Sequence, residues 1–231
     1  VIDATEMGDI AARVGVAYDI GMDSRKKHGE HIAPKKENDI IQDLTYVMIL
    51  KDYLKDMTIE KPKGYNPEIF YCSSESDQCK MGEKMNRTLW PKDSLLSYGR
   101  LPNGKVMINW PINGNDYYVN SIEQSEEERQ RSFEKAKLKS LQFLYYLQTE
   151  LGFNTYGLTD DEFPTDDGFP LIPYHRESRR IHGITTLTVN HVAQPYEQQQ
   201  PLYRTGIAVG DYPVDHHHAS HPNAKNLPEL H

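Results

Sequence analysis

The sequence lacks any apolar run that approaches the roughly 20 residues needed to cross a bilayer. Its first residues, 1–5, have the features of neither a signal peptide nor a transit peptide. Positive charge is also scarce, because 34 acidic residues outnumber 26 lysines and arginines and leave a formal net charge of -8. A negative chain is repelled by nucleic-acid phosphates. We therefore expect neither a membrane nor a nucleic acid as the main partner.

Several motifs that define enzyme classes are also missing. The chain contains no Gly-x-Gly-x-x-Gly, no Walker loop, no Gly-x-Ser-x-Gly and no His-Glu-x-x-His. The first of these absences matters most, because a glycine turn normally meets the pyrophosphate of a dinucleotide. The residues present therefore do not predict dinucleotide binding by the usual route.

The cysteines and the run of histidines do not have the pattern of a metal site. Cys72 and Cys79 form either a small disulfide or two free thiols, and without a second cysteine pair a zinc ribbon is not expected. Three consecutive histidines occur at 216–218, with His221 close by. In an extended segment adjacent side chains point to opposite faces, so at most two of the three share a direction. We interpret them as loop histidines and predict no metal site.

The composition, 37% hydrophobic with fifteen tyrosines, is sufficient for a buried core in one large or two small domains. The clearest predicted element is a helix at 125–151, because Ser125 and Glu128 form a capping box and Gly152 supplies the stop. An Asn-Gly pair at 103–104 predicts a tight turn. Runs rich in β-forming residues predict strands at 1–5, 16–20, 45–50, 105–110, 184–189 and 205–209.

The segment 174–183 concentrates three arginines, two histidines and a glutamate within ten residues, and the predicted strand 184–189 follows directly. Charge of this density is costly to bury without partners. One interpretation is a guanidinium cluster at the mouth of a packed sheet, which would bind an anionic or heavily oxygenated ligand. The other interpretation is a solvated charged turn joined to a strand.

A second polar cluster follows the predicted strand 105–110. Asn109, Trp110, Asn115 and Asp116 place amides and a carboxylate beside a tryptophan at the end of a strand. This pattern is typical of a rim that faces a ligand. It is equally typical of an ordinary turn, and both interpretations stay open.

Five segments occur in the order found in one enzyme family. Residues 1–9 match its IDAT-x-x-GD segment, with Met7 where many bacterial members have leucine. The others are Ile40-Ile-Gln-Asp-Leu-Thr-Tyr46, Lys105-Val-Met-Ile-Asn-Trp-Pro111 with Asn113-Gly-Asn-Asp116, Arg176-Glu-Ser-Arg-Arg-Ile-His-Gly183 and Gly210-Asp-Tyr-Pro-Val-Asp-His216. Over nearly its whole length the chain resembles a family of FAD-dependent oxidoreductases, some of whose bacterial members carry the label xanthan lyase.

The resemblance implies that the chain is the middle portion of such an enzyme, since the family's glycine-rich βαβ unit precedes the IDAT-like strand. Residues 1–21 are then a remnant of the flavin-binding α/β domain, 22–215 the substrate domain, and 216–231 the start of the segment that returns to the flavin. The expected fold class is α+β, with a mixed or antiparallel sheet and one long helix packed on it. We expect FAD in the whole enzyme, but not tight binding of FAD by these residues alone.

The resemblance also implies roles for individual residues. Hydride would pass from an oxygenated, carbohydrate-like substrate to the flavin. An arginine near the flavin could stabilise the anionic reduced ring, and His182 or His216 could act as base toward a substrate hydroxyl. The implied catalytic residues are Arg176, Arg179, Arg180, His182 and His216. The implied substrate-binding residues are Asn109, Trp110, Asn115, Asp116 and Tyr174, and the implied cofactor-binding residues are Asp3, Ala4 and Thr5.

Each role has a structural alternative. Arg179 and Glu177 could simply pair with each other or with neighbours, and His182 could be a hydrogen-bonded loop histidine. The alternative function is a carbohydrate-active lyase or a sugar-binding module, in which Tyr174, His175 and Arg176 supply the base and the charge neutralisation that a uronic acid needs. A third, non-enzymatic possibility is an inert structural domain.

Overall fold

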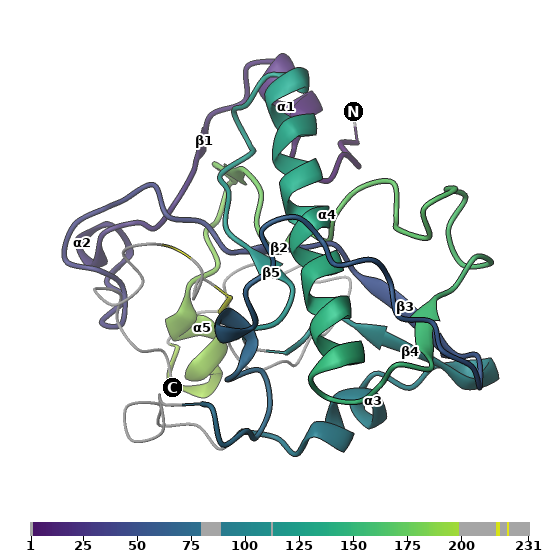
Figure 1. The fold of residues 1–231 in the computed structure, drawn as a ribbon. Coiled ribbons are helices and arrows are strands. Elements are labelled where there is room, and N and C mark those ends of the chain that lie inside the picture. The colour runs from purple at the N-terminus through teal and green to yellow at the C-terminus, as the bar shows by residue number, and fades with distance from the viewer. Residues whose placement is uncertain (1, 80–88, 112, 199–215, 218–220, 222–231) are drawn as a thin grey trace. The chain divides into compact units, whose positions relative to one another are not determined.

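The computed structural model of this chain describes residues 2–79, 89–111, 113–198, 216–217 and 221 (Figure 1). The chain divides into two compact units. Unit 1 combines residues 1–42 with 175–231, and unit 2 is the continuous stretch 43–174. The boundaries of the units therefore fall after 42 and after 174. The assignment of 1–21 to a flavin domain, 22–215 to a substrate domain and 216–231 to a return segment stays a prediction.

Unit 2 contains a three-stranded antiparallel sheet in the order β4-β3-β6. The central strand β3 (Met48–Asp52) pairs with β4 (Lys105–Ile108), with Met48 opposite Ile108, and with β6 (Tyr156–Leu158), with Leu50 opposite Leu158. A separate antiparallel pair joins β2 (Leu44–Thr45) to β5 (Asp116–Tyr117). The single strand predicted at 45–50 is thus two strands, β2 and β3. The antiparallel sheets and the long helix described next confirm the α+β class.

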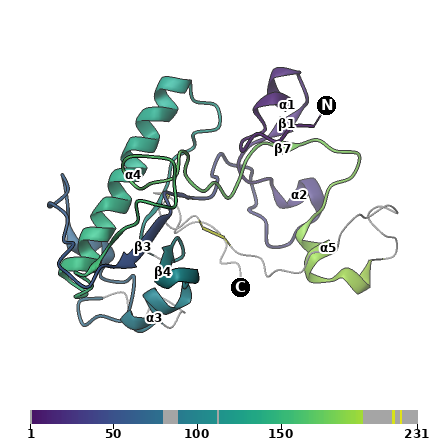
Figure 2. The same ribbon diagram turned by 90° about the vertical axis from the view of Figure 1, so that its right-hand side faces the viewer.

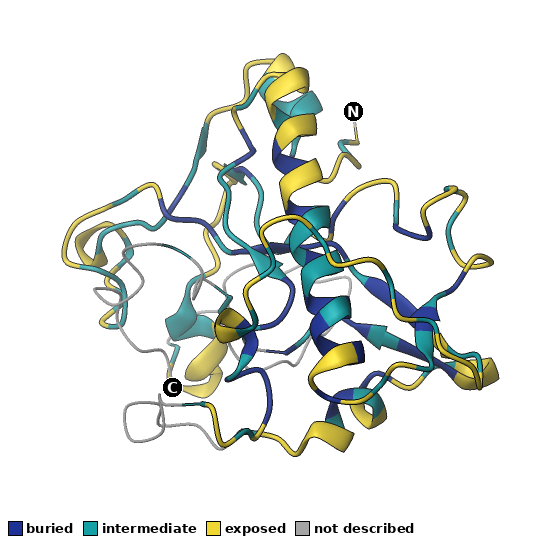
Figure 3. Ribbon diagram, viewed as in Figure 1, coloured by how far each residue is buried: buried dark blue, intermediate teal, exposed yellow. Residues whose placement is uncertain are grey.

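The long helix α4 (Glu126–Thr149) has the ends that the sequence predicts. The Ser125 hydroxyl accepts a hydrogen bond from the Glu128 backbone N–H at 3.3 Å, and the Glu128 carboxylate accepts one from the Ser125 N–H at 3.0 Å. Gly152, with a φ of 82°, follows the last turn. One face of the helix is buried and the opposite face is exposed (Figure 3). Within the described residues no helix combines the length and apolar composition of a membrane span.

The buried face of α4 forms the core of unit 2 together with β3 and β4. Met48, Leu50, Ile108, Phe143 and Leu144 are each 0% exposed and belong to one hydrophobic cluster. Figures 1 and 2 both show β3 and β4 next to the C-terminal half of α4. Burying each of these side chains contributes about 1.5–3 kcal/mol before conformational entropy is considered, so this cluster is the main source of stability in unit 2.

Three short helices connect these elements, and one contains the predicted turn. They are η1 (Pro67–Phe70), α3 (Lys92–Tyr98) and η2 (Pro102–Gly104). In η2 both Asn103 and Gly104 have positive φ, 63° and 71°. Asparagine and glycine tolerate this conformation better than other residues, and the turn leads directly into β4 as predicted.

Unit 1 is assembled from short elements at both ends of the chain. The N-terminal part supplies α1 (Asp9–Arg13), β1 (Tyr18–Asp19) and α2 (Arg25–His28), and the C-terminal part supplies β7 (Arg180–Ile181), α5 (Val189–Ala193) and η3 (Pro195–Glu197). β1 and β7 pair antiparallel. The strand predicted at 16–20 is therefore present, but it is only two residues long.

Two predicted strands are wrong, and a third lies outside the described residues. Residues 2–5 form no strand, and Ile2 is 93% exposed. Residues 184–188 form a bend and an irregular segment before α5, with Ile184 92% exposed. In the described part of the chain no strand pairs with either segment, and β propensity without a partner does not produce a strand. The predicted strand at 205–209 is not within the described part of the chain.

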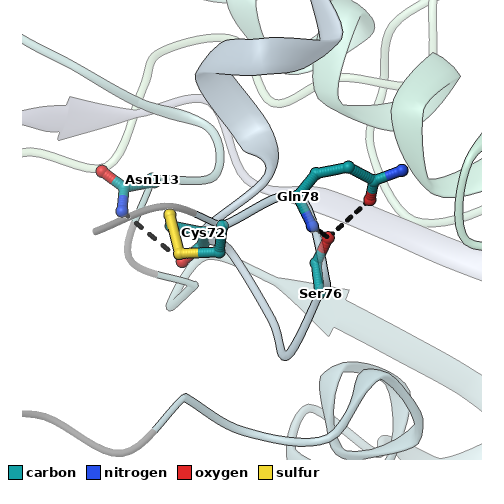
Figure 4. Close-up of a disulfide and its surroundings, with 5 residues drawn as sticks. Cys72, Ser76, Gln78 and Asn113 are labelled. Atoms are coloured by element: carbon teal, nitrogen blue, oxygen red, sulfur yellow. Dashed lines mark hydrogen bonds between the residues drawn. A yellow bond between two sulfur atoms is a disulfide. The ribbon is translucent and has the colours of Figure 1, made fainter. Parts of the chain in front are cut away.

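The two cysteines are joined by a disulfide in unit 2 (Figure 4). Cys72 and Cys79 close a small polar loop in which the Gln78 N–H donates to the Ser76 hydroxyl at 3.2 Å. Outside the loop, the Asn113 side chain donates to the Cys72 carbonyl at 3.4 Å. Of the two alternatives that the sequence left open, the structure contains the disulfide.

One charged side chain of α4 lies against the apolar core. The ammonium of Lys139 is 4.3 Å from the centroid of the Phe70 ring. Burial lowers the pKa of Lys139 from 10.5 to about 8, although the negative charge of Asp116 acts in the opposite direction. A lysine whose pKa falls on folding opposes folding while it is charged.

We predict that Lys139→Met raises the free energy of unfolding at pH 7 by about 1–3 kcal/mol, because it removes the cost of desolvating the charge. The penalty in the wild type is complete below pH 8 and disappears as the pH rises toward 10.5, the value at which the unfolded lysine titrates. The gain should therefore shrink between pH 8 and 10.5. Urea unfolding at pH 7 and pH 10 measures it, with the exposed Lys135→Met on the same helix as control. An equal gain at both pH values would contradict the explanation.

Candidate functional site

Unit 1 contains a pocket of about 700 Å³, a size within the usual range for small-molecule sites, roughly 300–1,000 Å³. Part of its wall is apolar, formed by Ile32, Ala33, Leu187, Val189 and Val192. Another part is charged or ionisable, formed by Asp19, Asp23, Lys27, Glu30, Glu177 and Arg180 together with His28, His182 and His216. The pocket can therefore accept a ligand that has both an apolar face and hydrogen-bonding groups.

The pairing of β1 with β7 places the central side chains of the pocket. Asp19 is directly opposite Arg180, and Tyr18 is opposite Ile181. The pairing continues one residue further, because the His182 N–H donates to the Ala17 carbonyl at 2.9 Å. The pairing thus brings three residues from the two ends of the chain to one wall of the pocket: Asp19, Arg180 and His182.

His182 is oriented by Asp19. Its Nε2 lies 2.8 Å from Asp19 Oδ2, and the Lys27 ammonium donates to the same oxygen and lies 2.9 Å from Asp23 Oδ1. The hydrogen bond from Lys27, and then that from His182, lowers the pKa of Asp19 to about 2. Asp19 is therefore an ionised carboxylate at neutral pH, which favours the imidazole tautomer with its proton on Nε2.

Arg180 lies between two carboxylates. Its guanidinium is 3.2 Å from Asp23 Oδ1 and 3.4 Å from Glu177 Oε1, and it also donates to the Gly21 carbonyl. Burial raises the pKa of Glu177, although a hydrogen bond from the Gln42 N–H and the charge of Arg180 act against the rise. Burial also tends to raise the pKa of Asp23, but Lys27 and Arg180 bring it below its ordinary value. The charges of this wall form one connected network.

The contacts of Arg179 indicate a structural role. Its side chain is 6% exposed, donates to the Met7 carbonyl at 2.7 Å and pairs with Asp9 at 2.9 Å. The guanidinium carbon also lies 5.2 Å from the centroid of the Tyr18 ring. A Cβ on Gly8 would lie 3.6 Å from the Cβ of Arg179. Arg179 therefore holds the end of the IDAT-x-x-GD segment in place.

The three residues with an implied cofactor role make contacts within their own segment. The Asp3 carboxylate accepts hydrogen bonds from the Thr5 hydroxyl at 2.6 Å, the Thr5 N–H at 2.8 Å and the Ala11 N–H at 2.8 Å. These bonds, that of the hydroxyl first, hold the pKa of Asp3 below its ordinary value. Thr5 accepts from the Asp9 N–H at 2.7 Å, and Ala4 is exposed. Asp3 and Thr5 thus fix the start of α1, and their role toward a cofactor stays a prediction.

Of the implied catalytic residues, Arg180, His182 and His216 line the pocket. Arg179 is directed toward residues 7–9, and Arg176 is half-buried in unit 1 outside the residues that line the pocket. The sequence pattern therefore found three members of the wall. In the described part of the chain, no group of three or more His, Cys, Asp or Glu side chains is placed to bind a metal ion.

The implied substrate-binding residues belong to unit 2, and they differ in their exposure. Asn115 is 1% exposed, and its side-chain amide donates to the carbonyls of Tyr46 at 2.9 Å and Ile108 at 3.2 Å. Asn115 thus links backbone segments inside the core, and its role toward a substrate stays a prediction. Asp116 accepts a hydrogen bond from the Thr45 hydroxyl.

Of the other members, Trp110 is partly buried and Tyr174 is exposed. Trp110 packs in a ring cluster with Trp90 and Tyr98, with centroids 4.6–5.1 Å apart. Trp90 and Tyr98 are 43% and 59% exposed, so this cluster lies at the surface of unit 2. Tyr174 is 48% exposed, and its backbone pairs with that of Thr45. Asn109 is half-buried.

The sequence pattern missed Asp19, Asp23 and Lys27, which are as central to the pocket as the arginines. A signal for them was present: two acidic residues precede the basic segment 25–28 within a few positions. What could not be inferred is that these residues lie beside Glu177 and Arg180, more than 150 positions further along the chain.

A family model described as FAD dependent oxidoreductase matches residues 1–229 of this chain. No curated protein matches the chain, and no solved structure matches it.

We predict that Arg179→Ala destabilises unit 1 by about 2–4 kcal/mol, because it removes the largely buried guanidinium that contacts Asp9 and the Met7 carbonyl. Hydrogen–deuterium exchange at the backbone of residues 7–19 should become faster. The matched control is Arg13→Ala, which removes an exposed arginine from α1 of the same unit. Equal exchange in the two variants would show that Arg179 does not hold this segment.

Proposed function

We propose, since this chain belongs to the FAD dependent oxidoreductase family, that it takes part in the FAD-dependent oxidation of an oxygenated, carbohydrate-like substrate. The observation that carries the proposal is the family match, which extends over residues 1–229. The pocket of unit 1 supports it further, because this pocket combines a histidine–carboxylate pair with hydrogen-bonding and apolar walls. In this proposal the pocket binds the substrate.

The residues of this chain do not fit the pyrophosphate of FAD. Such a group is normally held by backbone N–H groups of a glycine-rich turn at a helix N-terminus, and the sequence contains no Gly-x-Gly-x-x-Gly. The Asp3 carboxylate is already engaged by Thr5 and Ala11. We therefore propose that tight binding of FAD requires residues other than these. FAD, when bound, supplies the hydride acceptor.

His182 is the proposed general base. With its Nε2 proton held by Asp19, its Nδ1 has a lone pair that can accept the proton of a substrate hydroxyl. Lys27 donates to the same Asp19 oxygen and helps to keep this carboxylate ionised. Where FAD is bound as acceptor, loss of this proton would favour transfer of the hydride from the adjacent carbon. The role of Arg180 is to orient the substrate through whichever guanidinium N–H groups remain available.

A second candidate function rests on the ring cluster of unit 2. Exposed aromatic faces such as those of Trp90 and Tyr98 can stack on the apolar face of a sugar. This cluster supports a sugar-binding surface, independent of any redox role. A lyase that acts on uronic acids stays an alternative, in which Tyr174, His175 and Arg176 supply the base and the charge neutralisation.

We predict that His182→Gln lowers the rate of anaerobic flavin reduction by a hydroxylated substrate by about 100-fold at saturating FAD, because it removes the base. The control is His31→Gln, an exposed histidine of unit 1 that does not line the pocket.

The proposal fails if His182→Gln and His31→Gln reduce flavin at equal rates. Binding of FAD by the unmodified chain is a separate measurement, made by gel filtration with excess FAD. Flavin retained in equal molar amount with the protein would contradict the inference that these residues lack the pyrophosphate site.

A further inference from the structure

The pocket of unit 1 has an excess of negative charge despite its arginine-rich sequence. Four carboxylates line it, Asp19, Asp23, Glu30 and Glu177, against two permanent cations, Lys27 and Arg180. With the histidines neutral, the sum is therefore two positive minus four negative charges, or -2. A site of this charge repels an anion that approaches it.

The two cations are also engaged by carboxylates. Asp23 contacts both of them, at 2.9 Å from the Lys27 ammonium and 3.2 Å from the Arg180 guanidinium, and it lies 3.3 Å from His28. Glu177 contacts Arg180 from the other side at 3.4 Å. The carboxylates are the more buried partners, with side-chain exposures of 16% for Asp23 and 19% for Glu177 against 37% for Arg180. Solvent therefore screens these contacts less than it screens an exposed ion pair.

We infer that Asp23 and Glu177 determine the specificity of this pocket, and that they select uncharged, hydroxyl-rich ligands over anionic ligands of the same shape. The inference rests on the proposed function for its link to oxidation, but the binding preference follows from the charges alone. An entering carboxylate would have to displace Asp23 or Glu177 from Arg180 while lying beside both of them. A hydroxyl meets no such conflict, because it can donate to a carboxylate and accept from Arg180 or Lys27 at the same time.

The apolar wall is consistent with the same ligand class. Ile32, Leu187 and Val192 line the pocket together with the charged network. A pyranose ring presents C–H groups on its faces and hydroxyls around its edge, so it can contact both walls. The choice between a neutral and an anionic sugar then depends on the charge of a single substituent. Two sugars that differ only in this substituent measure its effect.

The test compares glucose with glucuronate, which differ only at C6, by equilibrium dialysis on the unmodified chain and its variants. We expect the unmodified chain to bind glucose more tightly than glucuronate. Asp23→Asn and Glu177→Gln each release Arg180 from one carboxylate. Each should raise the affinity for glucuronate, relative to that for the neutral sugar, by about 10-fold. The matched control is Glu37→Gln, which changes the net charge of unit 1 equally at an exposed position outside the pocket.

Each outcome decides the inference. Preference for glucuronate by the unmodified chain, binding of neither sugar, or an unchanged ratio in both pocket variants would overturn it, and so would an equal shift in Glu37→Gln. Circular dichroism identifies a variant that does not fold, and the other pocket variant then provides the comparison. Dialysis needs no FAD. A neutral-sugar preference, with no flavin reduction by the same sugar when FAD is shown to be bound, would therefore overturn the proposed oxidation and leave the binding specificity in place.

Discussion

The pairing of β1 with β7 is the constraint on which the described part of unit 1 depends. It joins Asp19 to Arg180 across more than 150 residues of intervening chain. A pair of two-residue strands has little stability of its own. Side chains beside the pairing add further links between the same two parts of the chain, through Arg179 to the Met7 carbonyl, Arg180 to the Gly21 carbonyl and Glu177 to the Gln42 N–H. The residues that form the pocket are therefore also the residues that assemble the unit.

Because residues of the segment 174–183 both line the pocket and hold unit 1 together, the charges of this segment cannot be interpreted as one group. The sequence offered two interpretations, an arginine cluster for an anionic or oxygenated ligand and a solvated charged turn. The structure separates the two neighbouring arginines: Arg179 is buried against residues 7–9, and Arg180 lines the pocket between Asp23 and Glu177. Neither interpretation describes both side chains. In extended backbone, successive side chains point in opposite directions, so adjacent arginines need not share a site.

The parts of the fold that the sequence predicted correctly are those controlled by local interactions. The capping box of α4, the glycine after it and the Asn-Gly turn before β4 each depend on residues a few positions apart. The strands at 1–5 and 184–189 were predicted from composition alone and are absent, because a strand also needs a partner that composition does not reveal. Asn115 is a similar case. Its polar side chain indicated exposure, but the carbonyls of Tyr46 and Ile108 satisfy its amide inside the core.

The net charge of the pocket was the property that the sequence predicted least well, because it also depends on residues that are far apart in the chain. Counting charges along 174–183 gives a strongly basic segment, yet the pocket that includes Arg180 has a net negative lining. The difference comes from Asp19, Asp23 and Glu30, which are supplied by the N-terminal part of unit 1. An arginine that is already paired with two carboxylates does not offer an incoming anion the bidentate contact that makes free guanidinium groups good anion sites. The ligands that a pocket can bind thus depend on the partners that its charged groups contact in the fold. Here the antiparallel pairing of β1 with β7 determines those partners.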